Sequence, residues 1–254
     1  MIGSGMIETR GLTRSFGATQ VLAGVDLSVG QGESMCVIGQ SGTGKSVLLK
    51  CILGLIAPDA GQVLWRGRPL DRTRRPEFLR GFGMLFQGGA LFDSLSVWQN
   101  VAFRLRQRMP DGRARAIAVD KLARVGLAPE TADLMPAQLS GGMARRVGLA
   151  RAIADDPAVI FFDEPTTGLD PIRARRIDDL IRGIVRETGA TAITITHDMD
   201  TVRAVGDRVA LLQDGRIRWQ GTTEAMQDAA PMAAFLGRVP DHRQQHRAAP
   251  GAPD

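Results

Sequence analysis

The chain has 254 residues, of which 44% are hydrophobic and 23% are charged, enough for one large α/β core with a smaller subdomain. Its formal charge of +5 is a mild excess carried by arginine, because lysine occurs only at positions 45, 50 and 121. Two cysteines exclude a disulfide framework and fit a reducing compartment. Neither a signal peptide nor an apolar run of about 18 residues is recognisable, so we expect any membrane role to require a partner.

The first segment, residues 6–38, is expected to be rich in β-structure. Apolar residues alternate with small or polar ones over 21–29, and a glycine-rich turn separates them from an apolar run at 34–38. That run predicts a short buried strand. Phe16 precedes the first hairpin, and its ring could stack on a base or belong to the core.

A glycine-rich loop with the sequence GQSGTGKS follows that strand, and apolar residues at helical spacing over 47–55 predict a helix after it. Strand, loop and helix in this order are the context of a phosphate-binding loop. Its glycines let backbone N–H groups approach phosphate oxygens, and the helix dipole adds positive potential. Lys45 would reach the β- and γ-phosphates of ATP, and Ser46 would ligate Mg²⁺. The loop consists of Gly39, Gln40, Ser41, Gly42, Thr43, Gly44, Lys45 and Ser46.

The middle of the chain changes character. Residues 61–71 predict a hairpin, and residues 88–156 predict an inserted helical subdomain with a break at 110–112. Gln87 ends the short apolar run 84–86, where its amide could contact Mg²⁺ and an attacking water.

A second anion-binding pattern lies within this helical region. Ser140, Gly141 and Gly142 precede a predicted helix, and a hydroxyl with glycine N–H groups at a helix start can bind an anion or simply cap the helix. One ATP has one γ-phosphate, which Lys45 already holds. The second pattern is therefore best explained as binding the ATP of a partner subunit, which predicts a head-to-tail pair with two-fold symmetry.

Polar side chains end two further buried strands. The run 158–162 ends in Asp163 and Glu164, and the run 191–196 ends in His197. Ligands bind at the carboxyl edge of such sheets. We expect Asp163 to hold Mg²⁺ directly or through water, Glu164 to act as general base on the attacking water, and His197 to reach that water and the γ-phosphate.

The last third of the chain predicts a helix and a hairpin. Asp170 is an expected N-cap, with Pro171 at the first helical position, and the helix should end at Gly189. Residues 209–220 predict a hairpin with a type I′ turn. The tail after residue 237 is rich in Pro, Arg, His and Ala, and we expect it to be flexible.

These ordered motifs together resemble the nucleotide-binding subunits of ABC transporters over residues 6–235. The resemblance implies an α/β P-loop NTPase core with an N-terminal antiparallel β subdomain and a helical subdomain at about 88–156. It implies an ATP-binding domain at 1–236 followed by a tail at 237–254. It further implies that Phe16 and Asp170 contact ATP. The catalytic set would be Glu164, His197, Lys45 and Gln87, and the metal set would be Ser46, Gln87 and Asp163.

A narrower resemblance is to the Mla-type phospholipid transporters, which maintain the lipid asymmetry of the outer membrane. It rests on residues 86–103 and on Met143 in place of the commoner glutamine. It implies an ATPase dimer on the cytoplasmic face of the inner membrane, bound to an integral membrane permease. A periplasmic lipid-binding subunit and a small cytoplasmic STAS-domain protein would complete the complex. The candidates for permease contact, each of which could instead pack internally, are Leu91, Phe92, Val97 and Trp98.

Two alternative functions remain open from the sequence. The first is the ATPase subunit of a small-solute importer, such as one for polar amino acids. The second is a soluble ABC ATPase acting on DNA or ribosomes, which the arginines within 66–80 and 104–115 favour because basic stretches attract phosphates. Such proteins usually carry coiled-coil insertions or two ATPase halves, so we expect no nucleic acid. A P-loop kinase would leave residues 140–142 without an explanation.

Overall fold

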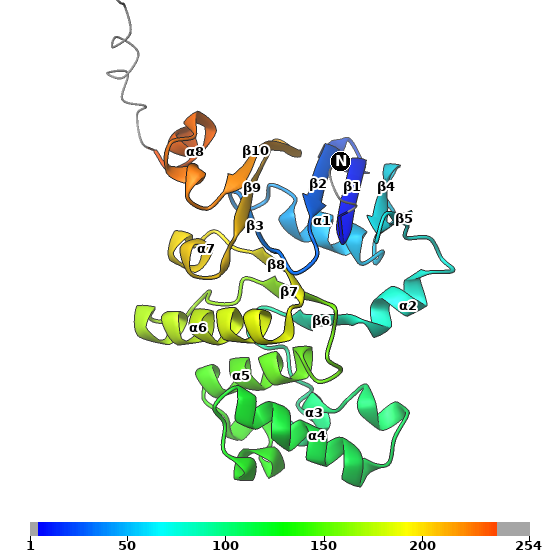
Figure 1. Ribbon diagram of the computed structural model, residues 1–254, viewed down its shortest axis with the longest axis vertical. Coiled ribbons are helices and arrows are strands. Elements are labelled where there is room, and N and C mark those ends of the chain that lie inside the picture. The colour runs from blue at the N-terminus through cyan, green and yellow to red at the C-terminus, as the bar shows by residue number, and fades with distance from the viewer. Residues whose placement is uncertain (1–4, 238–254) are drawn as a thin grey trace, which may run out of the picture.

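The structure is a computed structural model, and it describes residues 5–237. The described residues form an antiparallel sheet, a larger mixed sheet and a group of helices, in this order along the long axis (Figure 1). This arrangement confirms the expected α/β core with an antiparallel β part and an inserted helical part. The expected flexible tail at 237–254 lies outside the described residues, apart from Gly237.

The first sheet is antiparallel. It consists of β1 (Ile7–Phe16), β2 (Thr19–Val29), β4 (Ala60–Trp65) and β5 (Arg68–Pro69). β1 pairs with β2 on one side and with β4 on the other, and β4 turns back into β5 as the expected hairpin. Leu12 of β1 and Val25 of β2 are fully buried. Burial on one face explains the alternating pattern that the sequence shows over 21–29.

The second sheet carries the strands that lead to the site. They are β3 (Ser34–Ile38), β6 (Phe82–Leu85), β7 (Val159–Asp163), β8 (Thr191–Ile195), β9 (Arg208–Gln213) and β10 (Arg216–Thr222). The order is β10-β9-β3-β8-β7-β6, with the last five strands parallel and β10 antiparallel at the edge. Asp214 and Gly215, with φ of 50° and 67°, form the expected turn between β9 and β10.

Helices cover both faces of this sheet and extend beyond one edge. They are α1 (Lys45–Ile52), α2 (Arg75–Arg80), α3 (Val97–Val101), α4 (Asp111–Arg124), α5 (Gly141–Ala152), α6 (Pro171–Thr188), α7 (Met199–Val205) and α8 (Ala230–Phe235). The chain from β6 to β7 contains α3, α4 and α5, which lie together at the end far from the first sheet (Figure 1). Within residues 5–237, none of the helices has the length and apolar character needed to cross a membrane.

Consecutive residues of β7 face two separate cores. Phe161 packs into the core that includes Leu48 of α1, whereas Phe162 packs into the core that includes Ile181 of α6. Phe161 and Phe162 are both buried because parallel strands in the middle of a sheet are covered on both sides. Packing on both faces holds the end of β7 in place, and the chain enters the site there.

The helix expected after residue 170 is confirmed. Asp170 caps α6 by accepting a hydrogen bond from the Arg173 N–H at 3.0 Å, and Pro171 occupies the first helical position. Gly189 ends the helix with a left-handed φ of 63°.

Candidate nucleotide-binding site

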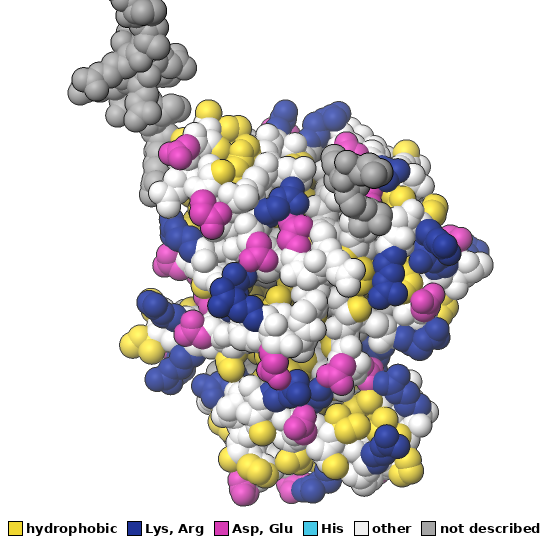
Figure 2. All heavy atoms as spheres, in the orientation of Figure 1, with side chains coloured by type: hydrophobic (Ala, Val, Ile, Leu, Met, Phe, Trp, Pro, Cys, Tyr) yellow, Lys and Arg dark blue, Asp and Glu magenta, His cyan; other side chains and the backbone are white. Residues whose placement is uncertain are grey.

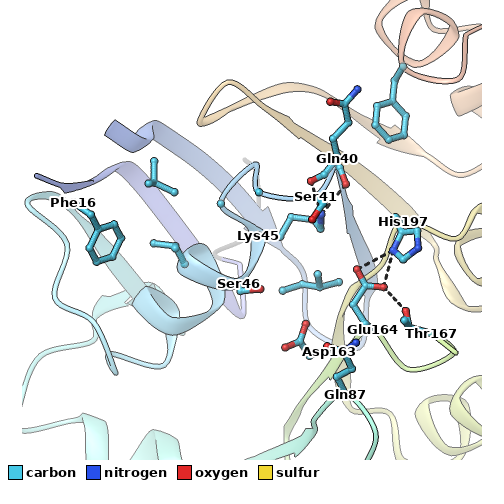
Figure 3. A pocket seen from close by; sticks show the side chains of 17 residues that line it. Phe16, Gln40, Ser41, Lys45, Ser46, Gln87, Asp163, Glu164, Thr167 and His197 are labelled. Atoms are coloured by element: carbon cyan, nitrogen blue, oxygen red, sulfur yellow. Dashed lines mark hydrogen bonds and ion pairs between the residues drawn. The ribbon is translucent and has the colours of Figure 1, made fainter. Parts of the chain in front are cut away.

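A cleft of about 820 Å³ lies where β3, β6, β7 and β8 end. The loop after β3 forms its floor, and one polar side chain after each of the other strands points into it (Figure 3). The predicted residues that line it are Phe16, Gly39, Gln40, Ser41, Gly42, Gly44, Lys45, Ser46, Gln87, Asp163, Glu164 and His197. Ligands bind at this edge in open α/β sheets, so the fold and the side chains point to the same place.

Three glycines of the loop are required by its geometry. Gly42 and Gly44 have left-handed φ of 81° and 99°, and a Cβ at Gly39 would lie 2.3 Å from the carbonyl oxygen of Leu212. α1 begins directly after Gly44 without a side-chain cap. The N–H groups of the first turn of α1 therefore face the cleft as donors, together with the positive end of the helix dipole.

Lys45 is buried and lies across the loop that precedes it. Its Nζ donates to the carbonyl oxygens of Gly39 at 2.7 Å and Gln40 at 2.9 Å. Burial lowers the pKa of Lys45, and the carboxylates of Glu164 and Asp163 partly offset this effect. An ammonium group has three N–H donors, so one donor remains for a phosphate oxygen.

Asp163 and Glu164 leave the end of β7 with different geometries. Burial raises the pKa of the Asp163 carboxyl, and the adjacent Glu164 raises it further, while Lys45 opposes the shift. Glu164 has a left-handed φ of 48°, and its N–H donates to the carbonyl oxygen of Ile195 in β8 at 2.8 Å. A left-handed glutamate costs about 1–3 kcal/mol, so the surrounding structure must hold it in place.

The Glu164 carboxylate is held by two other side chains (Figure 3). His197 Nδ1 lies 2.9 Å from Glu164 Oε2 and 3.1 Å from Oε1. The Thr167 hydroxyl donates to Oε2 at 2.8 Å. His197 is 60% exposed, whereas Glu164 is 17% exposed. The histidine therefore covers the carboxylate from the solvent side and remains able to reach a ligand in the cleft.

Phe16 lies on the opposite side of the loop from Glu164 and His197, with Lys45 and Ser46 between them (Figure 3). Its ring is 46% exposed, and the Arg14 guanidinium stands 4.9 Å from the ring centroid. Because the ring is exposed and lines the cleft, it is available for stacking rather than being part of the core.

Several predicted residues lie outside this cleft. The Thr43 side chain donates to the Gln40 carbonyl oxygen at 2.9 Å. Ser140 accepts a hydrogen bond from the Met143 N–H at 3.3 Å and so caps α5, with Gly141 and Gly142 in its first turn. Asp170 caps α6. Within the described chain, neither Asp170 nor residues 140–142 line the cleft.

Five lining residues were not predicted, namely Val21, Val47, Thr167, Ile195 and Phe235. Val47 and Ile195 lie within two residues of predicted ones. Thr167 has a local signal, because a threonine three residues after a carboxylate in a turn can donate back to it. Val21 and Phe235 have no such signal. They reach the cleft from β2 and α8, and only the tertiary fold brings these elements to the loop.

Ser46, Gln87 and Asp163 fit a magnesium ion by their chemistry. All three offer oxygen ligands, which Mg²⁺ prefers, and all three line the cleft. Across residues 5–237 there is no group of three or more His, Cys, Asp or Glu side chains that could hold a metal. Such a sparse set suits Mg²⁺, which usually keeps waters and shares phosphate oxygens with its nucleotide.

A second cleft, of about 410 Å³, lies between β6 and the helical part and is lined mainly by apolar side chains. Phe86, Phe92 and Phe103 are exposed there, and the rings of Phe92 and Phe103 stand 4.7 Å apart. Among the candidates for permease contact, Val97 is fully buried and packs internally. Leu91 and Trp98 are partly buried against the same core, so Phe92 alone is an exposed candidate.

Comparison with known proteins assigns the family. The ABC transporter family model matches residues 22–167, more than half of the chain. Protein TRIGALACTOSYLDIACYLGLYCEROL 3, chloroplastic, of Arabidopsis thaliana is 41% identical over 238 residues, covering 86% of this chain and 69% of the relative. The intermembrane phospholipid transport system ATP-binding protein MlaF of Haemophilus influenzae is 40% identical over 226 residues, covering 87% of this chain and 85% of the relative.

Other relatives carry different names. The methionine import ATP-binding protein MetN of Leifsonia xyli is 41% identical over 223 residues, covering 85% of this chain and 65% of the relative. Mycobacterial relatives that are 40% identical are longer, and this chain spans 58% of their length.

Solved structures agree with the family match. The dimeric structure of a bacterial ABC transporter cassette has a TM-score of 0.78 at 30% identity, covering 86% of this chain and 99% of that chain. A dimer of the same cassette in a post-hydrolysis state, bound to ADP and Pi, has a TM-score of 0.77 at 30% identity and the same coverage. With the phosphate loop and Glu164 meeting in one cleft, these matches show that the chain belongs to the ABC transporter family, as one of its ATP-hydrolysing subunits.

Proposed function

We propose that this chain powers phospholipid transport between the inner and outer membranes by hydrolysing ATP for a separate permease. The proposal of phospholipid as the substrate rests on the likeness to MlaF. The two proteins are 40% identical over 87% of this chain and 85% of the relative. The Arabidopsis relative is named after a glycerolipid. In this proposal the chain acts at the cytoplasmic face of the inner membrane, with residues 1–236 as the ATPase domain and 237–254 as a tail.

The proposed chemistry follows from the geometry of the cleft. The loop N–H groups and Lys45 bind the β- and γ-phosphates, and Phe16 stacks on the adenine. Glu164 accepts a proton from the attacking water, while His197 orients that carboxylate and contacts the γ-phosphate. Gln87 senses the γ-phosphate. Ser46, Gln87 and Asp163 would hold Mg²⁺, which neutralises phosphate charge when bound.

The residues outside the cleft complete the site in a dimer. Ser140, Gly141 and Gly142 stand at the start of α5, and the first N–H groups of a helix lack intrahelical partners and can bind an anion. We assign them to the ATP of a second copy, together with Asp170 at the start of α6. Support comes from the solved relative, which is a dimer and matches 86% of this chain.

The apolar cleft beside Gln87 is the proposed contact with the permease. Exposed Phe86, Phe92 and Phe103 would bury their rings against an apolar segment of that partner. Gln87 connects the two clefts because it follows Phe86 directly and lines the nucleotide cleft. Movement at the γ-phosphate could thereby reach the permease. A periplasmic lipid-binding subunit and a STAS-domain protein are the further proposed partners.

The small-solute importer is the main competing function, and the 41% identity with MetN supports it. Mass spectrometry of proteins that co-purify with the tagged chain from mildly solubilised membranes separates the two. A permease with a lipid-binding subunit and a STAS-domain protein supports phospholipid transport. A permease with a solute-binding protein contradicts it and favours the importer.

A nucleic-acid function has less support from the charges. Four of the five arginines within 104–115 form ion pairs with neighbouring carboxylates, whereas Arg113 and the arginines within 66–80 form none among the described residues. The pairs are Arg104–Asp155, Arg106–Asp111, Arg108–Asp155 and Arg115–Asp133. On the face shown in Figure 2, basic and acidic side chains are intermingled throughout. Recovery of ribosomes or nucleic acid without any membrane protein, in the same co-purification, would contradict the transport proposal.

A further inference from the structure

Within residues 5–237, Arg145 is a buried cation without a carboxylate partner. It lies on α5, is 6% exposed, and burial lowers the pKa of its guanidinium. Among the described residues no acidic side chain offsets that shift, and its Nε and Nη1 have no hydrogen-bond partner. Burial of an unpaired charge is costly. A cation at this position needs an explanation beyond packing.

The only side-chain hydrogen bond of Arg145 within residues 5–237 leads to the turn from Glu164 to Thr167. Its Nη2 donates to the carbonyl oxygen of Thr167 at 3.0 Å. Thr167 in turn donates from its hydroxyl to Glu164 Oε2 at 2.8 Å. One threonine therefore connects the Arg145 guanidinium to the Glu164 carboxylate, with the backbone on one side and the side chain on the other.

The turn from Glu164 to Thr167 depends on such outside support. Its own backbone bond, from the Thr167 N–H to the Glu164 carbonyl oxygen, is long at 3.4 Å, and Glu164 is in the left-handed region. The bond to Ile195 anchors the start of the turn to β8. Arg145 anchors its end to α5, so displacement of α5 would shift Thr167 and the carboxylate that it holds.

α5 also carries the second anion site. Ser140 caps the helix five residues before Arg145, a separation of about 7.5 Å along a helix axis. A helix transmits a shift at its first turn over this distance as a nearly rigid body. An anion bound at Ser140 is therefore mechanically connected to Glu164 of the same chain.

We propose that Arg145 is a positioning residue that couples the start of α5 to Glu164 through Thr167. ATP held by one copy, when it docks on Ser140 of the other, would align the general base of that other copy. This inference rests on the proposed function, in which Glu164 is the base and residues 140–142 meet a partner's nucleotide.

The test is steady-state ATP hydrolysis by the full-length purified chain at varied ATP concentration. R145M removes the donor and keeps the length, and we expect kcat to fall about tenfold with KM for ATP unchanged, because the phosphate loop is untouched. R145K restores a donor and should recover part of kcat. R146M is the matched control, since Arg146 donates instead to the Gly126 carbonyl oxygen, and its kcat should stay within about twofold of wild type.

A double variant tests whether Arg145 acts through Thr167. T167V removes the hydroxyl that holds Glu164 and should also lower kcat. If Arg145 acts through Thr167, the kcat of R145M/T167V is no lower than that of the slower single variant. The inference would be overturned if the two substitutions multiplied their effects on kcat, or if R145M had the wild-type kcat. Should R145M not fold, R145Q, which is too short to reach Thr167, replaces it.

Measuring E164Q alongside R145M distinguishes a failure of the proposed role of Glu164 from a failure of the coupling through Arg145. If E164Q hydrolyses ATP at nearly the wild-type rate, the proposed role of Glu164 fails, and the inference fails with it. If E164Q is inactive and R145M is normal, only the coupling through Arg145 is wrong.

Discussion

At the scale of single residues, Glu164 combines a left-handed backbone with a carboxylate that neighbouring side chains hold. Its φ of 48° turns the chain away from the sheet, and the N–H bond to Ile195 keeps it there. His197 and Thr167 then orient the carboxylate toward the phosphate loop. A general base needs a fixed position within reach of a water, and this arrangement provides one.

E164Q should bind ATP but hydrolyse it at least about 100-fold more slowly, because an amide cannot accept the proton from the attacking water. Glutamine keeps the size of the side chain and the hydrogen bond from Thr167. Phosphate release measures the rate, and equilibrium titration with a fluorescent ATP analogue measures binding. Turnover near the wild-type rate would refute the general-base role.

Lys45 and Lys50 offer a matched pair on α1. Lys45 is buried against the loop carbonyls, whereas Lys50 is exposed in the last turn. K45A should weaken nucleotide binding by at least about tenfold, since it removes a charged contact to the β- and γ-phosphates. K50A should leave binding within about twofold of wild type. Titration with the same ATP analogue decides, and equal affinities for both variants would contradict the role of Lys45.

At the scale of elements, α6 and α7 meet around a buried carboxylate. Asp178 of α6 is 3% exposed, accepts a hydrogen bond from the Thr201 hydroxyl at 3.2 Å, and has one oxygen without a partner among the described residues. The Thr201 hydroxyl of α7 also lies 2.8 Å from that of Thr166, which belongs to the turn from Glu164 to Thr167. Burial raises the pKa of Asp178 to about 7, with further contributions from Asp198, Asp179 and Asp200.

This pKa predicts a specific dependence of stability on pH. In the unfolded chain the Asp178 carboxyl titrates near 3.8, so between about pH 4 and pH 7 only the folded chain keeps the proton. Stability therefore falls as pH rises through this window, by about 1.4 kcal/mol between pH 6 and pH 8. For a domain of this size that corresponds to a decrease in Tm of about 3–5 °C.

D178N should remove this contribution, because an amide stays neutral across the range. Its Tm should therefore change less between pH 6 and pH 8 than that of wild type, in thermal melts followed by circular dichroism. D93N, at an exposed position whose carboxylate does not contribute to the pKa of Asp178, is the control and should keep the wild-type pH dependence. Parallel wild-type and D178N curves would show that Asp178 does not titrate in this window.

At the scale of the whole molecule, local patterns predicted most of the elements and the central part of the site. The phosphate loop, the polar residues after three buried strands, and the cap of α6 all depend on neighbours in the sequence. Thr167 has a local signal in the carboxylate three residues before it. Arg145 and Phe235 had none, because their partners lie on elements that only the folded chain brings together. Val97 belongs to the core for the same reason.

The dimer is the remaining feature that one copy cannot complete. G141D places a negative charge in the first turn of α5, where a partner's γ-phosphate is expected. A Cβ at Gly141 meets no atom within 4 Å, and an acidic residue in a first turn favours the helix, so the variant should fold. On the E164Q background, which keeps ATP intact, the chain should elute as a dimer with ATP in size-exclusion chromatography, and G141D should elute as a monomer. G112D makes the same change at the start of α4, where a Cβ is equally unobstructed, and should still dimerise. An ATP-bound dimer of G141D with unchanged affinity would mean that the start of α5 does not meet the partner's phosphate.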